Sequence, residues 1–432
     1  MKPRTILGIG WLGMILYAFP GYMSYDSVAQ LAEARLGWFH DAHPPAMAYL
    51  WENLDRVVAG PLGMLLLQVT CFLAGAYLIL RERLTPRLAA LLAVALLWFP
   101  PVANTMGVIW KDSQMAGYAL LGTALLLSPR LRVRVAGLGL LGLATAMRYN
   151  ALAMTFSIVV VLFVWDPAFR WWKRYGIALV AWVAITLAAR VVSTTLTDYH
   201  RFIWHQSLAL LDIVGTLREA PDVPDAELRQ QLAGTPLIAT TDLSARAKRT
   251  FHPDISPTER LWEATDKFFE RPDTQAERDA VARAWKTIVT SHLGAYLRYR
   301  TIVFGQLTQL DGTELGSPIY FWFGDIQDLD RSARQADHDA GPSGLQSLLH
   351  PAMYWLGDTW MFHVSLYVVL ALVLLPFSRG DRLVFALLTS GLLGELFLFL
   401  IAPTVDVRYS FWLMAVAVLS SILVVARRAA RQ

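Results

Sequence analysis

The chain has 432 residues, of which 55% are hydrophobic and 16 are tryptophan, and its formal net charge is +4. This apolar content exceeds that of a water-soluble domain and predicts a protein that crosses a membrane many times. The positive charge forms no basic stripe with interleaved aromatic residues, which excludes a nucleic-acid-binding protein. The single cysteine, Cys71, excludes disulfides and cysteine metal sites, and we interpret it as a small packed hydrophobic residue.

Apolar stretches that could span roughly 30 Å of hydrocarbon recur along the chain. They predict ten transmembrane helices, at about residues 6–20, 61–80, 88–103, 115–127, 135–147, 151–165, 175–196, 355–375, 383–401 and 409–425. The first stretch lacks a following small-residue cleavage site, so we expect it to stay as an anchor rather than to be removed as a signal peptide.

Basic residues lie between alternate predicted spans, which predicts the orientation of the chain. Besides Lys2 and Arg4, they are Arg81, Arg83, Arg87, Arg130, Arg132, Arg134, Arg170, Lys173, Arg174, Arg379, Arg382, Arg427, Arg428 and Arg431. Cytoplasmic connections are enriched in Lys and Arg, so both termini are predicted to be cytoplasmic. The remaining connections then face outward: residues 21–60, 104–114, 148–150, 197–350 and 402–408.

These assignments predict three domains. Residues 1–196 form an N-terminal membrane module with about seven spans, residues 197–350 a mostly helical soluble region outside the cytoplasm, and residues 351–432 a C-terminal membrane module with about three spans. In the soluble region, "PDAELRQQLAG" and "ERDAVARAWKTIVTSHLGAYL" are predicted helices. The second carries an apolar stripe at helical spacing, formed by Val281, Trp285, Ile288, Val289 and Leu293.

The first outer loop, residues 21–60, carries the most polar side chains that suit chemistry. Ser27 and Gln30 have the spacing of a capping box, which predicts a helix that starts at Ser27 with Asp26 just before it. Free amides at a helix start would keep the Asp26 carboxylate ionised, either as a base or only as a helix cap. Asp41 and His43 follow in "HDAHPP" before the chain enters the next helix.

The other outer connections of the membrane part also carry polar groups, namely Lys111, Asp112, Arg148, Asn150, Asp406, Arg408 and Tyr409. Singly, each cation could be an interfacial anchor whose side chain reaches the membrane surface. Together, Lys111, Arg148 and Arg408 place three cations on the same membrane face as the acids of the first loop. A carboxylate there can take a proton from a hydroxyl group while the cations neutralise a departing phosphate.

With these motifs the chain resembles the GT-C superfamily of membrane glycosyltransferases, which use polyprenyl-phosphate sugars as donors on the outer side of the membrane. The resemblance rests on "YDS", "HDAHPP", "WKD", "RYN" and "DVRY" and covers most of the membrane part. The first loop and "WKD" are most similar to less characterised bacterial members. The resemblance implies an all-α, GT-C-like polytopic fold in the bacterial inner (cytoplasmic) membrane, with its active site facing the periplasm or the exterior.

The resemblance also implies roles for residues. Asp26 maps to the catalytic acid of the first outer loop and Asp41 to a second acid, although the adjacent Asp-Glu pair of some members is absent. Lys111, Arg148 and Arg408 map to the donor phosphate. The supporting or substrate-binding residues would be Gln30, His43, Asp112, Asn150 and Tyr409. The implied reaction is an inverting hexosyl or pentosyl transfer from a polyprenyl-phosphate sugar to a glycolipid, glycan or protein acceptor, with membrane lipids around the protein and no nucleic acid.

Two questions stay open at this point. Asp41 and His43, with His40, could hold a divalent cation such as Mg²⁺ or Mn²⁺, or could simply hydrogen-bond within the loop. The alternative functions are a transporter or lipid flippase, which would place polar or broken helices near the bilayer midplane, and a surface-glycan polymerase or ligase that uses a polyprenyl-diphosphate donor. His200, His205, His252, Asp254 and the aromatic residues 320–325 have surface or interfacial roles as the simplest interpretation.

Overall fold

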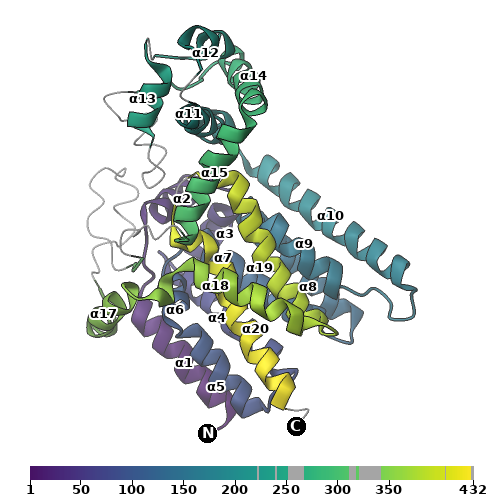
Figure 1. Ribbon diagram of the computed structural model, residues 1–432. Coiled ribbons are helices and arrows are strands. Elements are labelled where there is room, and N and C mark those ends of the chain that lie inside the picture. Colours follow the sequence, from purple (N-terminus) through teal and green to yellow (C-terminus); the bar gives the residue numbers. More distant parts are fainter. Residues whose placement is uncertain are drawn as a thin grey trace. The chain divides into compact units, whose positions relative to one another are not determined.

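The computed structural model describes residues 1–220, 223–238, 241–251, 267–310, 318–320, 342–403 and 405–429. In this part of the chain the regular structure is helical, with isolated β-bridges (Figure 1). The chain separates into two compact units. Unit 1 comprises Met1–Tyr199, Ser317–Glu395 and Arg408–Gln432, and unit 2 comprises His200–Gly316 and Leu396–Val407. The predicted boundaries differ from this division, because the end of the 197–350 region groups with unit 1.

Unit 1 holds most of the helices. They are α1 (Pro3–Ala18), α2 (Tyr25–Leu36), α3 (Ala46–Asp55), α4 (Leu62–Arg81), α5 (Pro86–Leu97), α6 (Pro100–Met106), α7 (Lys111–Leu126), α8 (Leu131–Met147), α9 (Ala151–Leu162), α10 (Trp171–Leu196), α17 (Gly344–Gly357), η4 (Trp360–Phe362), α18 (Val364–Leu374), η5 (Leu375–Ser378), α19 (Arg382–Ile401) as far as Glu395, η6 (Val407–Ser410) from Arg408 onward, and α20 (Phe411–Ala429). The start of α1 and the end of α20 lie at the same end of unit 1 (Figure 1).

Every predicted span coincides with one or more of these helices, but fewer of them meet the length of a full crossing. Among the residues that the structure describes, four helical segments are long and apolar enough to cross a membrane, or up to five if the bent pair α5–α6 is one span. The four are Leu62–Arg81, Trp171–Leu196, Arg382–Ile401 and Val407–Ala429. Two shorter apolar helices are Ala151–Leu162 and Val364–Ser378. The chain is therefore a multi-pass membrane protein, and the total of ten spans stays a prediction.

The span predicted over residues 88–103 is not one straight helix. Its helix ends at Leu97, and α6 starts at Pro100 after a bend of 70°. Proline forces the residue before it out of the helical region, and Phe99 accordingly has φ −60° and ψ 125°. Pro100 and Pro101 then begin α6, where their missing N–H groups cost nothing. The prolines thus direct α6 toward the segment that precedes Lys111.

Close packing of α4 against α7 fixes the helix that carries Lys111. A Cβ atom added at Gly75 of α4 would lie 2.5 Å from backbone atoms of α7, so only glycine permits this approach. Gly117 of α7 meets the backbone of α4 in the same way, at 2.9 Å from the Gln68 carbonyl oxygen. Small residues at helix contacts are how membrane helices gain van der Waals packing, because lipid supplies no hydrophobic drive between them.

Unit 2 is built around α11 (Ala209–Glu219). Its other helices are the π-helix η1 (Trp204–Leu208), α12 (Asp225–Gln231), α13 (Leu243–Thr250), α14 (Gln275–Ser291) and α15 (Leu293–Thr308). α11 packs on η1, α13, α14 and α15, while α12 packs on α13 and α14. The predicted helix over residues 277–297 is interrupted at His292, and Leu293 is exposed while Val281 and Ile288 are buried. Inside the unit, Asp212 pairs with Arg300 and accepts a hydrogen bond from the Trp285 indole at 2.8 Å.

Candidate functional site

Helix α2 begins earlier than its sequence suggests, and this changes the position of Asp26. The N-cap is Ser24, whose backbone N–H donates to the Ser27 hydroxyl at 3.2 Å. The predicted start at Ser27 is therefore wrong. Ser24 and Ser27 form the capping box, and they have the same three-residue spacing as Ser27 and Gln30, from which the start was predicted. Asp26 lies in the first turn of α2, where the helix dipole favours a negative charge.

A short parallel bridge joins the chain before α2 to the chain before α7. The Tyr22 N–H donates to the Gly107 carbonyl at 3.1 Å, and the Ile109 N–H donates to the Tyr22 carbonyl at 2.8 Å. The Ser27 hydroxyl donates to the Ile109 carbonyl at 2.6 Å. Four residues after Tyr22 comes Asp26, and three after Val108 comes Lys111, so the bridge holds the two charged residues near each other.

Buried amides fix the same segment from the side of α4. The Gln68 amide donates to the carbonyls of Met106 at 2.7 Å and Val108 at 3.0 Å. The Gln114 amide donates to the Gln68 side-chain oxygen at 2.9 Å, and Tyr118 donates to Gln114 at 2.6 Å. A buried hydrogen-bond network in which the polar groups have partners makes the backbone around it rigid. This network therefore holds the segment from Met106 to Val108 in one conformation.

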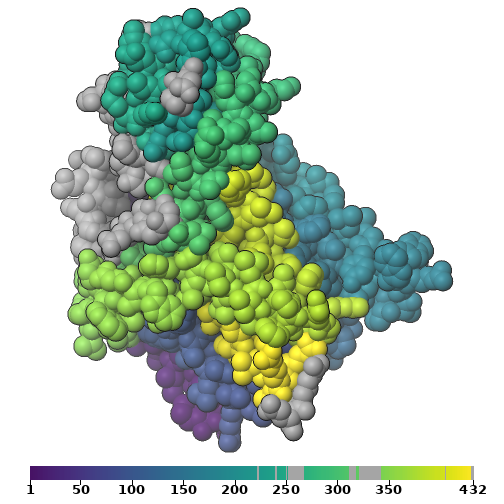
Figure 2. Space-filling model, viewed as in Figure 1, coloured from purple at the N-terminus to yellow at the C-terminus, as the bar shows by residue number. Residues whose placement is uncertain are grey.

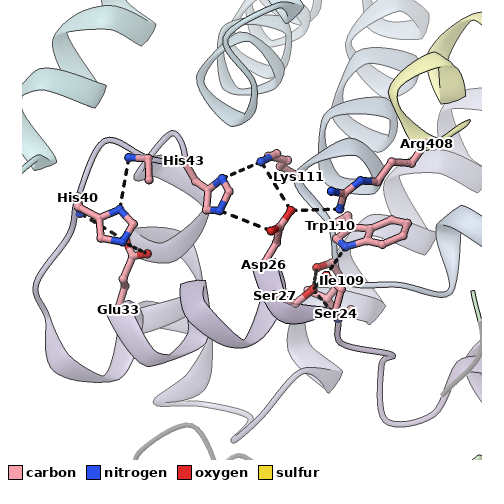
Figure 3. Close-up of polar contacts among 11 residues, drawn as sticks. Ser24, Asp26, Ser27, Glu33, His40, His43, Ile109, Trp110, Lys111 and Arg408 are labelled. Carbon is pink, nitrogen blue, oxygen red and sulfur yellow. Dashed lines mark hydrogen bonds and ion pairs between the residues drawn. The ribbon is translucent and has the colours of Figure 1, made fainter. Parts of the chain in front are cut away.

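The carboxylate of Asp26 lies among three basic side chains that come from separate parts of the sequence (Figure 3). Arg408 approaches it most closely, with Nη1 at 3.1 Å from Oδ2. Lys111 Nζ lies 4.0 Å from the same oxygen, and His43 Nε2 lies 3.8 Å from Oδ1. The Asp26 side chain is 24% exposed, so the cluster remains open to an incoming molecule.

His43 stands between the acid and the lysine. Its Nδ1 lies 2.7 Å from Lys111 Nζ, and Figure 3 shows the ring turned with its other nitrogen toward Asp26. Burial and the neighbouring Lys111 charge lower the pKa of His43 to about 3, so the ring is neutral at pH 7. A lysine ammonium can only donate, so Nδ1 accepts and the ring proton sits on Nε2, which faces the carboxylate.

Burial alone would raise the pKa of the Asp26 carboxyl, but the surrounding Lys111, His43 and Arg408 outweigh it and hold the pKa well below its ordinary value. Asp26 is therefore ionised at pH 7. With His43 neutral, two cations face one carboxylate, which leaves the cluster with one positive charge. An anion with several oxygen atoms would complement this charge.

Trp110 was not among the residues singled out from the sequence, although it forms the wall of the cluster. The Arg408 guanidinium lies over its ring at 4.6 Å from the ring centroid. The Trp110 indole N–H donates to the Ser24 hydroxyl at 2.5 Å, which ties the ring to the N-cap of α2. Trp110 is the first residue of the motif "WKD", and tryptophan is the ring on which an arginine stacks best, so its position beside Lys111 could have indicated this role. Tyr320 packs edge-on against Trp110 at 4.3 Å between ring centroids.

A second, more deeply buried group of polar residues lies beside the Asp26 cluster. Arg148 forms an ion pair with Asp112, and their side chains are only 9% and 1% exposed. The Arg148 guanidinium also lies 5.0 Å from the centroid of the Tyr409 ring. Glu395 accepts a hydrogen bond from Ser410 at 2.9 Å. Glu395 was missed in the sequence, although a lone acid inside "GELFLFL" is the usual signal of a functional or paired intramembrane group.

The remaining predicted site residues lie outside the contacts of Asp26 in the described part of the chain. Gln30 is buried in the second turn of α2, and the Asp41 backbone carbonyl accepts a hydrogen bond from Tyr149 at 3.0 Å. Asn150 is 2% exposed, and neither atom of its amide has a hydrogen-bond partner among the described residues. Arg148 and Asp112 bind each other rather than Asp26.

The predicted metal ligands do not converge on one point. His40 Nε2 lies 3.2 Å from Glu33, and His43 is engaged by Lys111 and Asp26. Within the described ranges, no group of three His, Cys, Asp or Glu side chains could hold a metal ion. His252, Asp254 and residues 321–325 lie outside the described residues, and His205 packs on Trp204 in unit 2.

No family model and no curated protein matches the chain. Among solved structures, the chain is similar to the crystal structure of ArnT from Cupriavidus metallidurans bound to undecaprenyl phosphate. The identity is 12% and the TM-score 0.35, and the match covers 99% of this chain and 78% of that chain.

Proposed function

We propose that the protein is an integral membrane glycosyltransferase that moves a sugar from a polyprenyl-phosphate donor to the hydroxyl group of a lipid-linked, glycan or protein acceptor. The observation that carries this proposal is the partly exposed carboxylate of Asp26, which is ionised and lies beside the cations Arg408 and Lys111. The three side chains together have a net charge of +1. All three side chains lie at helix ends or in the connections between helices, where a lipid phosphate at the membrane surface can reach them.

In the proposed reaction the acceptor oxygen attacks the anomeric carbon of the donor sugar from the face opposite the phosphate. The bond between the anomeric carbon and the phosphate oxygen breaks, and the acceptor proton passes to Asp26. The polyprenyl phosphate leaves with the bonding electrons, and Lys111 and Arg408 hold its added negative charge. The configuration at the anomeric carbon is inverted.

Lys111, His43 and Arg408 together make Asp26 a weak base in the absence of donor, because they hold the pKa of the carboxyl low. A donor phosphate competes with Asp26 for Arg408 and Lys111, since its oxygens match the guanidinium better than one carboxylate oxygen does. Losing part of these contacts raises the pKa of Asp26. Donor binding thus activates the base, and the chain stays inactive toward acceptors until the phosphate has arrived.

The other predicted site residues take supporting roles in this proposal. The neutral His43 directs its Nε2 proton at Asp26 and keeps Lys111 in place. Arg148 forms an ion pair with Asp112, so we assign it no contact with the phosphate. Its guanidinium instead packs on the Tyr409 ring, which also contacts Arg408. Asn150 has a buried amide with no hydrogen-bond partner among the described residues, and we propose that it faces the bound substrate.

The test is a transfer assay with the purified full chain, a panel of polyprenyl-phosphate sugars and a membrane extract as acceptor. Release of polyprenyl phosphate is measured for the native chain, for Asp26→Asn and for the control Glu270→Gln, whose side chain is 61% exposed in unit 2. We expect Asp26→Asn to lose roughly 100-fold or more in rate and the control to keep it. A native rate for Asp26→Asn would exclude Asp26 as the base.

The same assay separates the alternatives. A flippase or transporter would move an intact substrate and release no polyprenyl phosphate. A polymerase or ligase would release polyprenyl diphosphate and would tolerate the loss of a carboxylate. Addition of a chelator tests the divalent cation, since transfer that stops with the chelator and returns with Mg²⁺ or Mn²⁺ would require one.

A further inference from the structure

The end of unit 1 that carries the tips of α4 and α20 has a second charged cluster. Asp381, just before α19, accepts two contacts of 2.6 Å from Arg83, which follows α4. Arg427, in the last turn of α20, lies 3.6 Å from the same carboxylate. The Asp381 side chain is only 3% exposed, and its Oδ1 also accepts the Val384 backbone N–H at 3.2 Å. Asp381 thus joins three helices that are each able to cross a membrane.

Two further arginines flank this acid and are not used by it. Arg379 and Arg382 are exposed, and within the described residues their side chains form no ion pair or hydrogen bond. Gly380 between them has φ +74°, which a glycine adopts without strain, and this turn places one arginine on each side of Asp381. One carboxylate among four arginines leaves three positive charges.

Two pockets adjoin this turn and share Gly380, Asp381 and Arg382. One, of about 610 Å³, is lined by arginines and by Leu383 and Ala426. The other, of about 670 Å³, has a different wall that is mostly apolar and is formed by Val161, Tyr175, Leu372, Leu375, Pro376 and Phe385. Both volumes lie in the range of roughly 300–1,000 Å³ that is usual for small-molecule sites. α18 and α20, whose ends flank these pockets, lie against each other on one face of unit 1 (Figure 2).

We propose that this turn is a binding site for an anionic phospholipid, whose phosphate contacts Arg379 and Arg382 while an acyl chain lies along Leu372, Leu375 and Phe385. The site lies at the opposite end of α20 from Arg408 and is independent of the proposed transfer reaction. α20 has 19 residues, which separates the two by about 28 Å along the helix axis.

The occupant is a lipid rather than a soluble anion because charge and apolar surface occur together. Leu372 and Phe385 are 53% and 40% exposed, so a hydrocarbon chain gains contact with them without moving the protein. Arginine forks match phosphate oxygens, and basic pockets between membrane helices attract anionic headgroups. A free phosphate would use the arginines but would leave the apolar wall uncovered.

The experiment titrates the detergent-solubilised full chain with phosphatidylglycerol and counts bound lipid by native mass spectrometry, with the melting temperature as a second readout. Phosphatidylcholine with the same acyl chains and soluble glycerol phosphate form the comparison arms. The pocket variant is R379Q/R382Q. The matched control is R132Q/R170Q, which removes two exposed arginines at the starts of α8 and α10 in unit 1.

We expect phosphatidylglycerol to bind the pocket variant roughly tenfold more weakly than the native chain, and to bind the control variant unchanged. Equal binding to the pocket variant overturns the site, and equal binding of phosphatidylcholine overturns its charge selectivity. Glycerol phosphate that raises the melting temperature as much as the lipid, at equal concentration, overturns the lipid as occupant. Should the double variant unfold in detergent, R379Q and R382Q are titrated singly, each with an expected loss of about threefold.

Discussion

The two ends of unit 1 are built from the same charges. At one end Asp26 faces Lys111 and Arg408, and at the other Asp381 faces Arg83 and Arg427. In both, the pKa of the carboxyl lies below its ordinary value even though burial opposes this. The distances differ, since Arg83 contacts both oxygens of Asp381 at 2.6 Å, whereas the cations of Asp26 stand 3.1 Å and 4.0 Å away.

Exposure separates the two acids further. Asp381 is 3% exposed and caps α19, and its carboxylate holds helices together through its ion pairs. Asp26 is 24% exposed, and its cations remain within reach of another anion. The same three charges therefore serve structure where they are close and buried, and suit chemistry where they are looser and open. Composition alone does not distinguish the two cases.

The largest effect that would sharpen this comparison is expected at Arg408. Arg408→Gln removes the closest cation of Asp26, and with it a group that stabilises the leaving phosphate. We expect a loss of about 100- to 1,000-fold in transfer rate with little change in folding. The rate of polyprenyl phosphate release measures it. Arg56→Gln is the matched control, because Arg56 lies in the same segment 21–60 as Asp26 but has 67% of its side chain exposed. An equal loss in both variants would contradict a role at the phosphate.

At the other end the corresponding change should affect stability. Asp381→Asn leaves Arg83 and Arg427 without their buried partner, which we expect to lower the free energy of unfolding by roughly 3 kcal/mol. Asp26→Asn, at a more exposed pair, should lower it by about 1 kcal/mol or less. Denaturant titration of both variants in the same detergent compares them. If Asp26→Asn destabilises the protein more than Asp381→Asn does, the structural role assigned to Asp381 and the chemical role assigned to Asp26 are contradicted.

The pH dependence of stability should arise at the Asp26 end through His43. Its pKa is about 3 in the folded chain and about 6.5 when unfolded, so the unfolded chain binds the extra proton between these values. The contribution is complete above pH 6.5 and falls by at most about 1.4 kcal/mol per pH unit below it. Unfolding measured at pH 7 and pH 5 should show a loss of up to about 2 kcal/mol in the native chain. His43→Gln should lose this slope, and an unchanged slope would refute the assignment. The depressed pKa of Asp26 acts only below its unfolded value near 4, outside this window.

The smallest effect concerns the turn at Gly380. Its φ of +74° strains any residue with a Cβ, so Gly380→Ala should cost about 1 kcal/mol of stability. The matched control is Gly176→Ala in α10, where no atom lies within 4 Å of the added Cβ and the helical backbone favours alanine. Melting temperatures should move in opposite directions, and a rise for Gly380→Ala would show that the turn is relaxed.

Hydropathy predicted where the helices of unit 1 lie, because a chain in lipid must bury its backbone groups in helices and show an apolar surface. It also predicted that Asp26, Lys111 and Arg408 share one end, since the arginine clusters assigned the connections to two sides. It failed at Pro100, where apolar side chains continue through the break. The double proline was the visible signal, and its effect on Phe99 is local and predictable.

Pairings could not be obtained from the sequence. Arg83 and Asp381 are 298 positions apart, and nothing in either segment indicates the other. Arg148 was grouped with Lys111 and Arg408 by its location, yet it binds Asp112, which follows Lys111 in the first turn of α7. The lone acid Glu395 in an apolar run was a visible signal that was missed, but its partner Ser410 could not be obtained from the sequence. Side-chain partners depend on helix rotation and depth, which hydrophobic periodicity does not determine when a helix is apolar on all sides.

The bridge between Tyr22 and Val108 has a consequence for how such chains can change over evolution. Backbone hydrogen bonds fix both segments of the bridge. The number of residues from each segment to its charged residue therefore determines where Asp26 and Lys111 lie. One inserted residue after Tyr22 would turn Asp26 by about 100° around α2 and away from Lys111. Surface loops in general tolerate insertions, whereas these two spacings are fixed together. A related chain that keeps the site is recognisable by an acid four residues after one aromatic and a lysine three after its partner, however little else it shares.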